Sequence, residues 1–270
     1  MRVSLDFQSK VVVVVGGTSG VNRGIAERFA SLGAKVAVAS RKQAKVDDTV
    51  AVLTKLGAEA FGFTCDVREP QAVDVGLAAT FEKFGAFDVL VSGAAGNFPA
   101  LFDDLSPNGF KSVVDIDLLG TYNVMKAAWP RLRKPGASVI NISAPQASLP
   151  MQAQVHVCAA KAGVDMITRT LAVEWGRDGV RINSIVPGPI DGTEGMSRLA
   201  PNDAARAEVT KSVPLGRFGT PGDIADACLF LSSELARFVT GAILHVDGGW
   251  SQTGCGNFGD YLATLSGKRA

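Results

Sequence analysis

The 270-residue sequence predicts an α/β protein with a doubly wound parallel sheet of about seven strands and helices on both faces. Short apolar runs, rich in β-branched residues, alternate along the chain with longer amphipathic segments, as in successive βα units. The apolar runs are continuous rather than alternating, which is typical of strands buried on both faces of a parallel sheet. Right-handed crossovers through the intervening helices complete this arrangement.

Each predicted strand is a short apolar run bounded by turn residues. The run 11–15 consists of five valines and meets two glycines directly. Branching at Cβ favours the extended backbone, so this is the clearest strand of the chain. The predicted strands are 11–15, 35–39, 60–64, 87–91, 138–142, 181–186 and 242–246.

The segments between these strands carry apolar residues at helical spacing. Gly33, Gly57 and Gly85 follow the first three of them, as expected where a helix ends in a left-handed residue. Gly120 falls inside the longest segment, so we expect that helix to be interrupted or bent near it. The predicted helices are 23–32, 43–56, 70–84, 108–132, 156–175 and 221–235.

No repeat, proline-rich linker or low-complexity tract divides the chain, so residues 1–270 are expected to form a single domain. The stretch 191–214 is polar and contains no predicted strand. We expect it to be a mobile lid with a small helix.

The composition argues against several functional classes. The sequence holds 27 basic and 26 acidic residues, a balance that does not favour a nucleic-acid partner. Four cysteines without a CxxC pair and only two histidines argue against a metal site. No apolar run approaches the length of about 18 residues that would span a membrane, and no secretory signal is present. We therefore expect a cytoplasmic protein.

A glycine-rich turn follows the first strand and is typical of a dinucleotide-binding site. Glycine lets the backbone approach a pyrophosphate, whose charge the N–H groups of the next helix then bind. The position between a strand and a helix makes the motif more specific than a glycine-rich loop elsewhere. The turn residues expected to bind the cofactor are Gly16, Thr18, Ser19, Gly20 and Val21.

The end of the second strand indicates which dinucleotide binds. An acid at this place accepts hydrogen bonds from the ribose of NAD, but here the residues are Ser40, Arg41 and Lys42. An arginine can bind a 2′-phosphate with two hydrogen bonds, whereas an acid would repel it. A solvated basic pair at a helix start is the alternative. Together with the glycine turn, these residues favour NADP(H).

Further motifs follow the later strands, and with them the sequence resembles the short-chain dehydrogenase/reductases over nearly its whole length. These motifs are 65–67, 93–96, 159–163, 187–190 and 246–249. The resemblance implies a Rossmann fold and a homo-oligomer, commonly a tetramer. The additional cofactor contacts that it implies are Asp66, Val67, Ala94, Ala95, Gly96, Lys161, Pro187, Gly188 and Ile190.

The catalytic set of that family is incomplete here. Where the family uses Asn, Ser, Tyr and Lys, this sequence has Asp117, Ala144, Val157 and Lys161, so only the lysine is kept. Tyr122 belongs to a literal YxxxK motif. It lies on the helix before strand 138–142, however, and the family's motif opens the helix after it.

We therefore expect Tyr122 to serve packing rather than catalysis. Asn22 replaces the third glycine of the first turn, and we expect the turn to be kept because asparagine tolerates a positive φ.

One branch of the family, the 2,4-dienoyl-CoA reductases, also lacks the tyrosine, and the sequence resembles its peroxisomal type most. The shared segments are 94–98, 115–117, 154–156 and 188–195. In that type an Asp stands at the position of Asp117, and a second Asp follows the lysine by four residues, as Asp165 does. The carboxyl-terminal sequence is not a peroxisomal address, so we expect a bacterial, cytoplasmic relative.

This resemblance implies an NADPH-dependent reductase that takes a conjugated acyl-CoA. Ketone reduction needs a proton at oxygen, whereas reduction of a dienoyl thioester spreads the charge onto the thioester oxygen and delivers the proton to carbon. A water polarised by Asp117 and Asp165 can supply that proton, while Lys161 holds the nicotinamide ribose.

Substrate contacts are expected from three residues near these acids and from basic residues of the lid. Asn97 and Phe98 follow the cofactor turn, and His156 lies at a helix start. Positive charge at the pocket mouth would suit the phosphates of CoA. The candidates for that charge are Arg198, Arg206 and Lys211.

Two alternatives stay open. The first is a carbonyl reductase, acting on a 3-oxoacyl group or a ketone, with an atypical acid. The second is a catalytically inactive dinucleotide-binding protein, which the loss of Ser and Tyr favours. Lys161 and Asp165 also have the spacing of a surface ion pair on one helix face.

Overall fold

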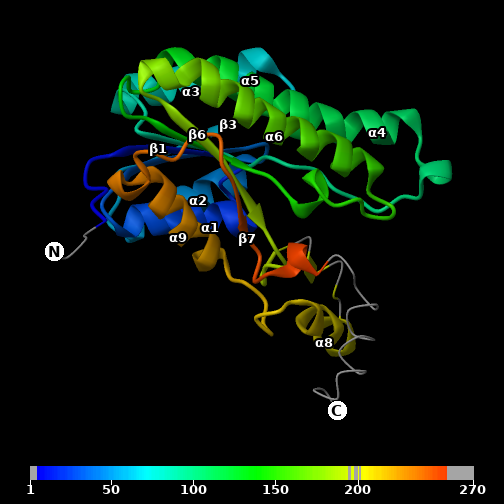
Figure 1. Ribbon diagram of the computed structural model, residues 1–270. Coiled ribbons are helices and arrows are strands. Elements are labelled where there is room, and N and C mark those ends of the chain that lie inside the picture. Colours follow the sequence, from blue (N-terminus) through cyan, green and yellow to red (C-terminus); the bar gives the residue numbers. More distant parts are fainter. Residues whose placement is uncertain (1–4, 194–195, 198–199, 201, 254–270) are drawn as a thin grey trace.

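The computed structural model describes residues 5–193, 196–197, 200 and 202–253, and it confirms the predicted Rossmann-like fold. All seven strands are parallel, in the order β3-β2-β1-β4-β5-β6-β7. Helices α3, α4, α5 and α6 cover one face of the sheet, and α1, α2 and α9 cover the other (Figure 1). Within the described residues, no helix has the length and apolar character that crossing a bilayer requires.

The strands agree closely with the apolar runs of the sequence. The fourth begins two residues later than expected, because Phe87 forms only an isolated bridge with Leu132. The strands are β1 Val11–Val15, β2 Lys35–Ser40, β3 Ala60–Thr64, β4 Val89–Ser92, β5 Ser138–Ile142, β6 Arg181–Pro187 and β7 Ile243–Val246.

The helices differ from the prediction mainly at their ends. The last one ends at Ser232, and a separate 3₁₀ turn follows at Glu234–Ala236. The α-helices are α1 Gly20–Ser31, α2 Gln43–Lys55, α3 Pro70–Phe84, α4 Pro107–Val113, α5 Gly120–Ala128, α6 Val155–Trp175, α8 Asp203–Ser212 and α9 Pro221–Ser232.

The single helix predicted over 108–132 is divided. Between α4 and α5 lies a π-helical segment, Val114–Leu119, and a 3₁₀ turn, Trp129–Arg131, follows α5. Gly120 lies directly after the π-helical segment, so the helix is interrupted near the expected position. A Cβ atom at Gly120 would lie 2.6 Å from Cγ2 of Val67, so only glycine lets the helix approach the loop after β3 this closely.

The stretch 191–214 contains the expected small helix, α8. The Asn202 side chain accepts a hydrogen bond from the Ala205 amide and caps that helix. Arg198 lies outside the described residues. The mobility of this stretch stays a prediction.

The valine run of β1 divides the core in two. Val12 and Val14 pack with α1 and α9, including Phe29 and Leu229. The other valines of the run, at positions 11, 13 and 15, pack on the opposite face with residues of α3, α5 and α6. Alternate side chains of a strand point to opposite faces, so a strand covered on both sides must be apolar throughout.

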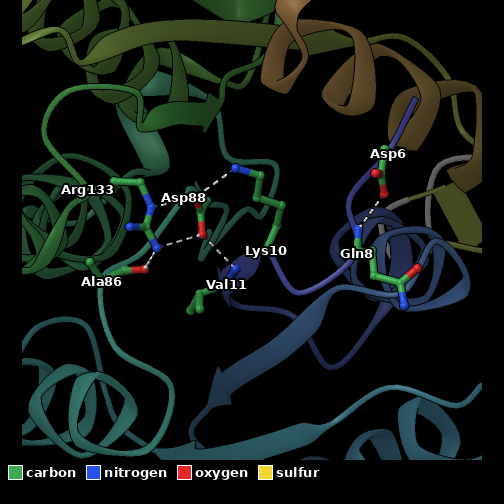
Figure 2. Close-up of polar contacts among 7 residues, drawn as sticks. All are labelled: Asp6, Gln8, Lys10, Val11, Ala86, Asp88 and Arg133. Carbon is green, nitrogen blue, oxygen red and sulfur yellow. Dashed lines mark hydrogen bonds and ion pairs between the residues drawn. The ribbon is translucent and has the colours of Figure 1, made fainter. Parts of the chain in front are cut away.

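Asp88 joins the amino-terminal ends of the central strands (Figure 2). Its carboxylate accepts hydrogen bonds from the Val11 amide at 2.9 Å, Nε of Arg133 at 2.7 Å and Nζ of Lys10 at 3.2 Å. Burial raises the pKa of Asp88, but the bonds from Arg133 and Val11 and the charges of Lys10 and Arg133 outweigh it, so the pKa is lowered. Asp88 thus fastens β1, β4 and the segment before β5 together.

We predict that Asp88→Ala lowers the free energy of unfolding at neutral pH by about 1–3 kcal/mol, because the Val11 amide is left without its buried acceptor. The lowered pKa makes this stabilisation present above about pH 4 and lost as pH falls through the folded-state pKa. Urea unfolding across that range measures it. Asp6→Ala, at an exposed acid of the same region, is the control (Figure 2). An equal loss for both variants would contradict the role of Asp88.

Candidate functional site

The loops after β1, β2, β3 and β4 line one cleft of about 380 Å³. These loops meet at the carboxyl ends of the strands, where β1 lies between β2 and β4 and the strand order reverses. Such a point is the usual ligand crevice of an open α/β sheet. The predicted cofactor residues that line the cleft are Gly16, Thr18, Ser19, Ser40, Arg41, Asp66, Val67, Ala94 and Ala95.

Other predicted cofactor residues lie outside that lining. Gly188 packs against Asp247, the residue that follows β7, since a Cβ atom on Gly188 would lie 2.6 Å from Cα of Asp247. Ile190 is buried. The residues outside the lining are Gly20, Val21, Gly96, Lys161, Pro187, Gly188 and Ile190.

The glycine turn is shaped by a close approach to the loop after β4. Gly16 has a φ of +83°, and a Cβ atom on it would lie 2.8 Å from the Ala94 nitrogen. The expected reason for Asn22 was wrong, because Asn22 lies inside α1 and not at a positive φ. Instead its Nδ2 donates to the Gly93 carbonyl at 2.7 Å and ties the two loops together.

Basic side chains gather at the end of β2. Arg41 and Lys42 are exposed at the cleft, together with Lys45 one turn into α2. Lys45 was not among the residues predicted from the sequence, and it joins Arg41 and Lys42 because it lies in the first turn of α2, directly after them. The Ser40 hydroxyl is buried and has no hydrogen-bond partner among the described residues. This set fits an additional phosphate better than a bare ribose.

Asp66 is held in place by Arg68. Nε of Arg68 lies 3.0 Å from Oδ1 and its Nη2 lies 2.6 Å from Oδ2 of the carboxylate. The hydrogen bond from the Arg68 side chain lowers the pKa of Asp66, with a smaller effect from the charge of Arg41. The carboxylate is therefore fixed at the edge of the cleft.

The π-helical segment turns Asp117 into the protein, where it is 1% exposed. Its Oδ1 accepts a hydrogen bond from the Gly96 amide at 2.7 Å, and its Oδ2 lies 3.3 Å from Nζ of Lys161. The same ammonium donates to the Ile142 carbonyl at 2.9 Å. A buried pair thus joins the β4 loop, the α4–α5 bend, β5 and α6.

Asp165 lies one helical turn beyond Lys161 and is 5% exposed, as is Lys161 itself. The alternative of a surface ion pair is therefore wrong. Burial raises the pKa of Asp165, against the lowering effects of the Ser143 and Ser184 hydroxyls and the charge of Arg169. Its Oδ1 has no hydrogen-bond partner among the described residues.

The tyrosine position of the family is apolar here. Val157 is 2% exposed and packs with Val113, Ala160 and the ring of Phe98. Tyr122 is 53% exposed on the outer face of α5 and α6, in a groove whose lining includes Trp129 but not Lys161. Tyr122 therefore lies away from Lys161, and its packing role stays a prediction.

The residues predicted to contact the substrate differ in their exposure. Asn97 is exposed, and Phe98 is half-buried against the His156 ring, 4.6 Å between centroids. His156 is 0% exposed, so any effect on a substrate would act through its neighbours. In the stretch 191–214, Arg206 pairs with Asp191, and Lys211 pairs with a glutamate of its own helix.

The fold agrees with the comparisons. Residues 15–251 match the family described as Enoyl-(Acyl carrier protein) reductase, and the chain belongs to the short-chain dehydrogenase/reductase family of oxidoreductases. The peroxisomal 2,4-dienoyl-CoA reductase of Arabidopsis thaliana, described as (3E)-enoyl-CoA-producing, is 43% identical over 90% of this chain and 84% of its own.

Two further matches are informative. A probable 2,4-dienoyl-CoA reductase of Bacillus subtilis, described as (2E)-enoyl-CoA-producing, is 38% identical over 90% of this chain and 97% of its own. A variant of actinorhodin polyketide ketoreductase, solved with NADPH, has a TM-score of 0.85 at 28% identity and covers 93% of this chain and 99% of its own.

We predict a pH-dependent stability difference between the wild type and Asp165→Asn. Because the pKa of Asp165 is raised by folding, its stabilisation is present below about pH 4 and is lost as pH rises through the folded-state pKa. Wild type should therefore lose stability relative to Asp165→Asn as pH rises from about 4 through the folded-state pKa. Denaturant unfolding at several pH values measures the difference, with Glu174→Gln on the same helix as control. A difference that is constant with pH would refute the prediction.

Proposed function

We propose that this chain reduces a 2,4-dienoyl-CoA to an enoyl-CoA with NADPH. The observation that carries the proposal is a buried Lys161–Asp117 pair beside Val157, which stands where the family's usual tyrosine would donate a proton to oxygen. Such a site suits a reduction whose proton goes to carbon. The relatives named 2,4-dienoyl-CoA reductase, at about 40% identity, support the same substrate class.

NADPH is the cofactor that the cleft fits best. A Cβ atom on Gly16 would collide with the loop after β4, so this position needs glycine. Because glycine has no side chain, the backbone of the turn can also approach a pyrophosphate closely. Arg41, Lys42 and Lys45 supply positive charge at the end of β2, where an NAD site has an acid. We assign the 2′-phosphate to these three residues.

The chemistry that the bound cofactor supplies is hydride transfer to the far carbon of the diene. Negative charge then spreads onto the thioester oxygen, and one proton must reach carbon to complete the reduction. We assign Lys161 to the nicotinamide ribose, because Asp117 and the Ile142 carbonyl fix its ammonium from two sides. We assign the proton to a water polarised by Asp117 and Asp165, the second of which has a raised pKa.

Assembly and location belong to the same proposal. Exposed apolar side chains on α5 and α6, among them Tyr122, Met166 and Val173, support the expected homotetramer. Several relatives are named as peroxisomal proteins, so the cytoplasmic location stays a prediction.

The function is tested by following NADPH oxidation with a 2,4-dienoyl-CoA, an enoyl-CoA and a panel of simple ketones. We expect turnover of the dienoyl-CoA alone. The product's double bond, determined by NMR, separates a 3-enoyl from a 2-enoyl product. Turnover of a ketone that Tyr122→Phe abolishes would favour the carbonyl reductase instead, and no turnover of any substrate would favour an inactive binding protein.

We predict that Arg41→Ala weakens NADPH binding by about 1.5–3 kcal/mol, the usual contribution of a hydrogen bond to a charged group. NADH binding should change little, because NADH lacks the 2′-phosphate. Equilibrium binding by nicotinamide fluorescence measures both. Arg28→Ala is the control, since Arg28 pairs with Asp226 on the surface between α1 and α9. Wild-type binding of NADH as tight as that of NADPH would overturn the cofactor assignment.

We predict that Asp117→Asn lowers dienoyl-CoA turnover by about 10²–10⁴-fold, as expected for a group in acid–base catalysis, with little loss of NADPH binding. Asp165→Asn should cost less. The matched control is Asp115→Asn, because Asp115 lies in the same π-helical segment but pairs with Lys111. Turnover within about twofold of wild type for Asp117→Asn would show that the carboxylate is only structural.

A further inference from the structure

Four hydrogen bonds hold the loop 96–100, which continues the cofactor turn after β4. The Phe98 carbonyl faces two donors, Nε2 of His156 at 2.9 Å and Nε2 of Gln154 at 3.3 Å. The Ala100 amide donates to the Ala153 carbonyl at 3.0 Å. At the other end of the loop, the Gly96 amide donates to Asp117 at 2.7 Å. The loop is thus fixed on both sides of Asn97.

Two energetically unfavourable features at the start of α6 accompany these contacts. Because a carbonyl only accepts, the ring hydrogen of His156 must be on Nε2, and its buried Nδ1 is left without a partner among the described residues. Ala153 has a φ of +61°, in the left-handed region that residues other than glycine rarely adopt. Features of this kind persist where the surrounding structure imposes them, commonly at functional sites.

We propose that His156 and Gln154 are positioning residues for the acyl thioester, acting through the loop 96–100 rather than by contact with the substrate. Asn97 is exposed and follows Gly96, whose amide is bonded to Asp117, so the Asn97 backbone is held close to the Lys161–Asp117 pair while its side chain stays free to meet a substrate. A donor held in advance stabilises developing charge on an oxygen without reorganisation. The aromatic contact of Phe98 with His156 fixes the same loop from its apolar side.

This inference rests on the proposed function, and its test uses His156→Leu and His156→Gln. Leucine removes the donor to the Phe98 carbonyl, whereas the glutamine amide can replace it. We expect His156→Leu to lower kcat/KM for dienoyl-CoA about tenfold, the effect of about 1.4 kcal/mol. His156→Gln should restore it to within about threefold, and the Kd for NADPH should stay within about twofold in both. Val155→Ala, at the exposed neighbouring position, is the matched control.

Hydrogen exchange of the peptide that spans 96–100 provides a readout that does not need activity. We expect faster exchange in His156→Leu and in Gln154→Leu than in the wild type. If the wild type fails to reduce a dienoyl-CoA, the proposed function fails, and the exchange rates still decide whether these side chains hold the loop. If His156→Leu does not fold, Gln154→Leu is used for both measurements. Unchanged exchange in the leucine variants, or a kcat/KM within twofold of wild type in a folded leucine variant, would overturn the proposal.

Discussion

The buried ammonium of Lys161 is the constraint on which the rest of the site depends. A charge removed from water destabilises a fold strongly unless partners replace the water, and here these are the Asp117 carboxylate and the Ile142 carbonyl. To bring the carboxylate there, the chain interrupts its helix with the π-helical segment Val114–Leu119. The second carboxylate oxygen then fixes Gly96. An asparagine at this position would supply a dipole but no charge to balance the lysine.

Most of the fold could be predicted because parallel strands must be apolar on both faces, and the sequence shows this directly. The bounds of β1, β3 and β5 agree with the apolar runs. The π-helical segment could not be predicted, since Gly120 indicates a bend but nothing local indicates an i→i+5 hydrogen-bond pattern. That pattern arises from the packing of Gly120 against Val67 and from the ion pair between Lys161 and Asp117, which are both tertiary contacts. Local propensity does not contain this information.

The cleft at the carboxyl ends of the strands was easier to predict than the contacts that hold Asn22 and His156. Motifs that follow successive parallel strands must meet at one edge of the sheet, so their order in the sequence already placed them together. The contacts of Asn22 with Gly93 and of His156 with Phe98 join segments 71 and 58 residues apart. Neither periodicity nor residue spacing indicates that two residues so far apart in the sequence are in contact. A polar side chain near a turn is equally compatible with a direct contact to a ligand. Burial distinguished the two possibilities for His156.

The valine at the tyrosine position and the hydrogen-bonded loop 96–100 are linked through the packing of Phe98. A tyrosine at position 157 would need a partner for its hydroxyl, and a buried hydroxyl without one destabilises the protein. Valine instead joins an apolar cluster that includes Phe98. With its ring in that cluster, Phe98 brings its carbonyl to His156 and Gln154. The site thus loses a proton donor for oxygen and gains a fixed backbone beside the Lys161–Asp117 pair, a combination suited to a reaction that protonates carbon.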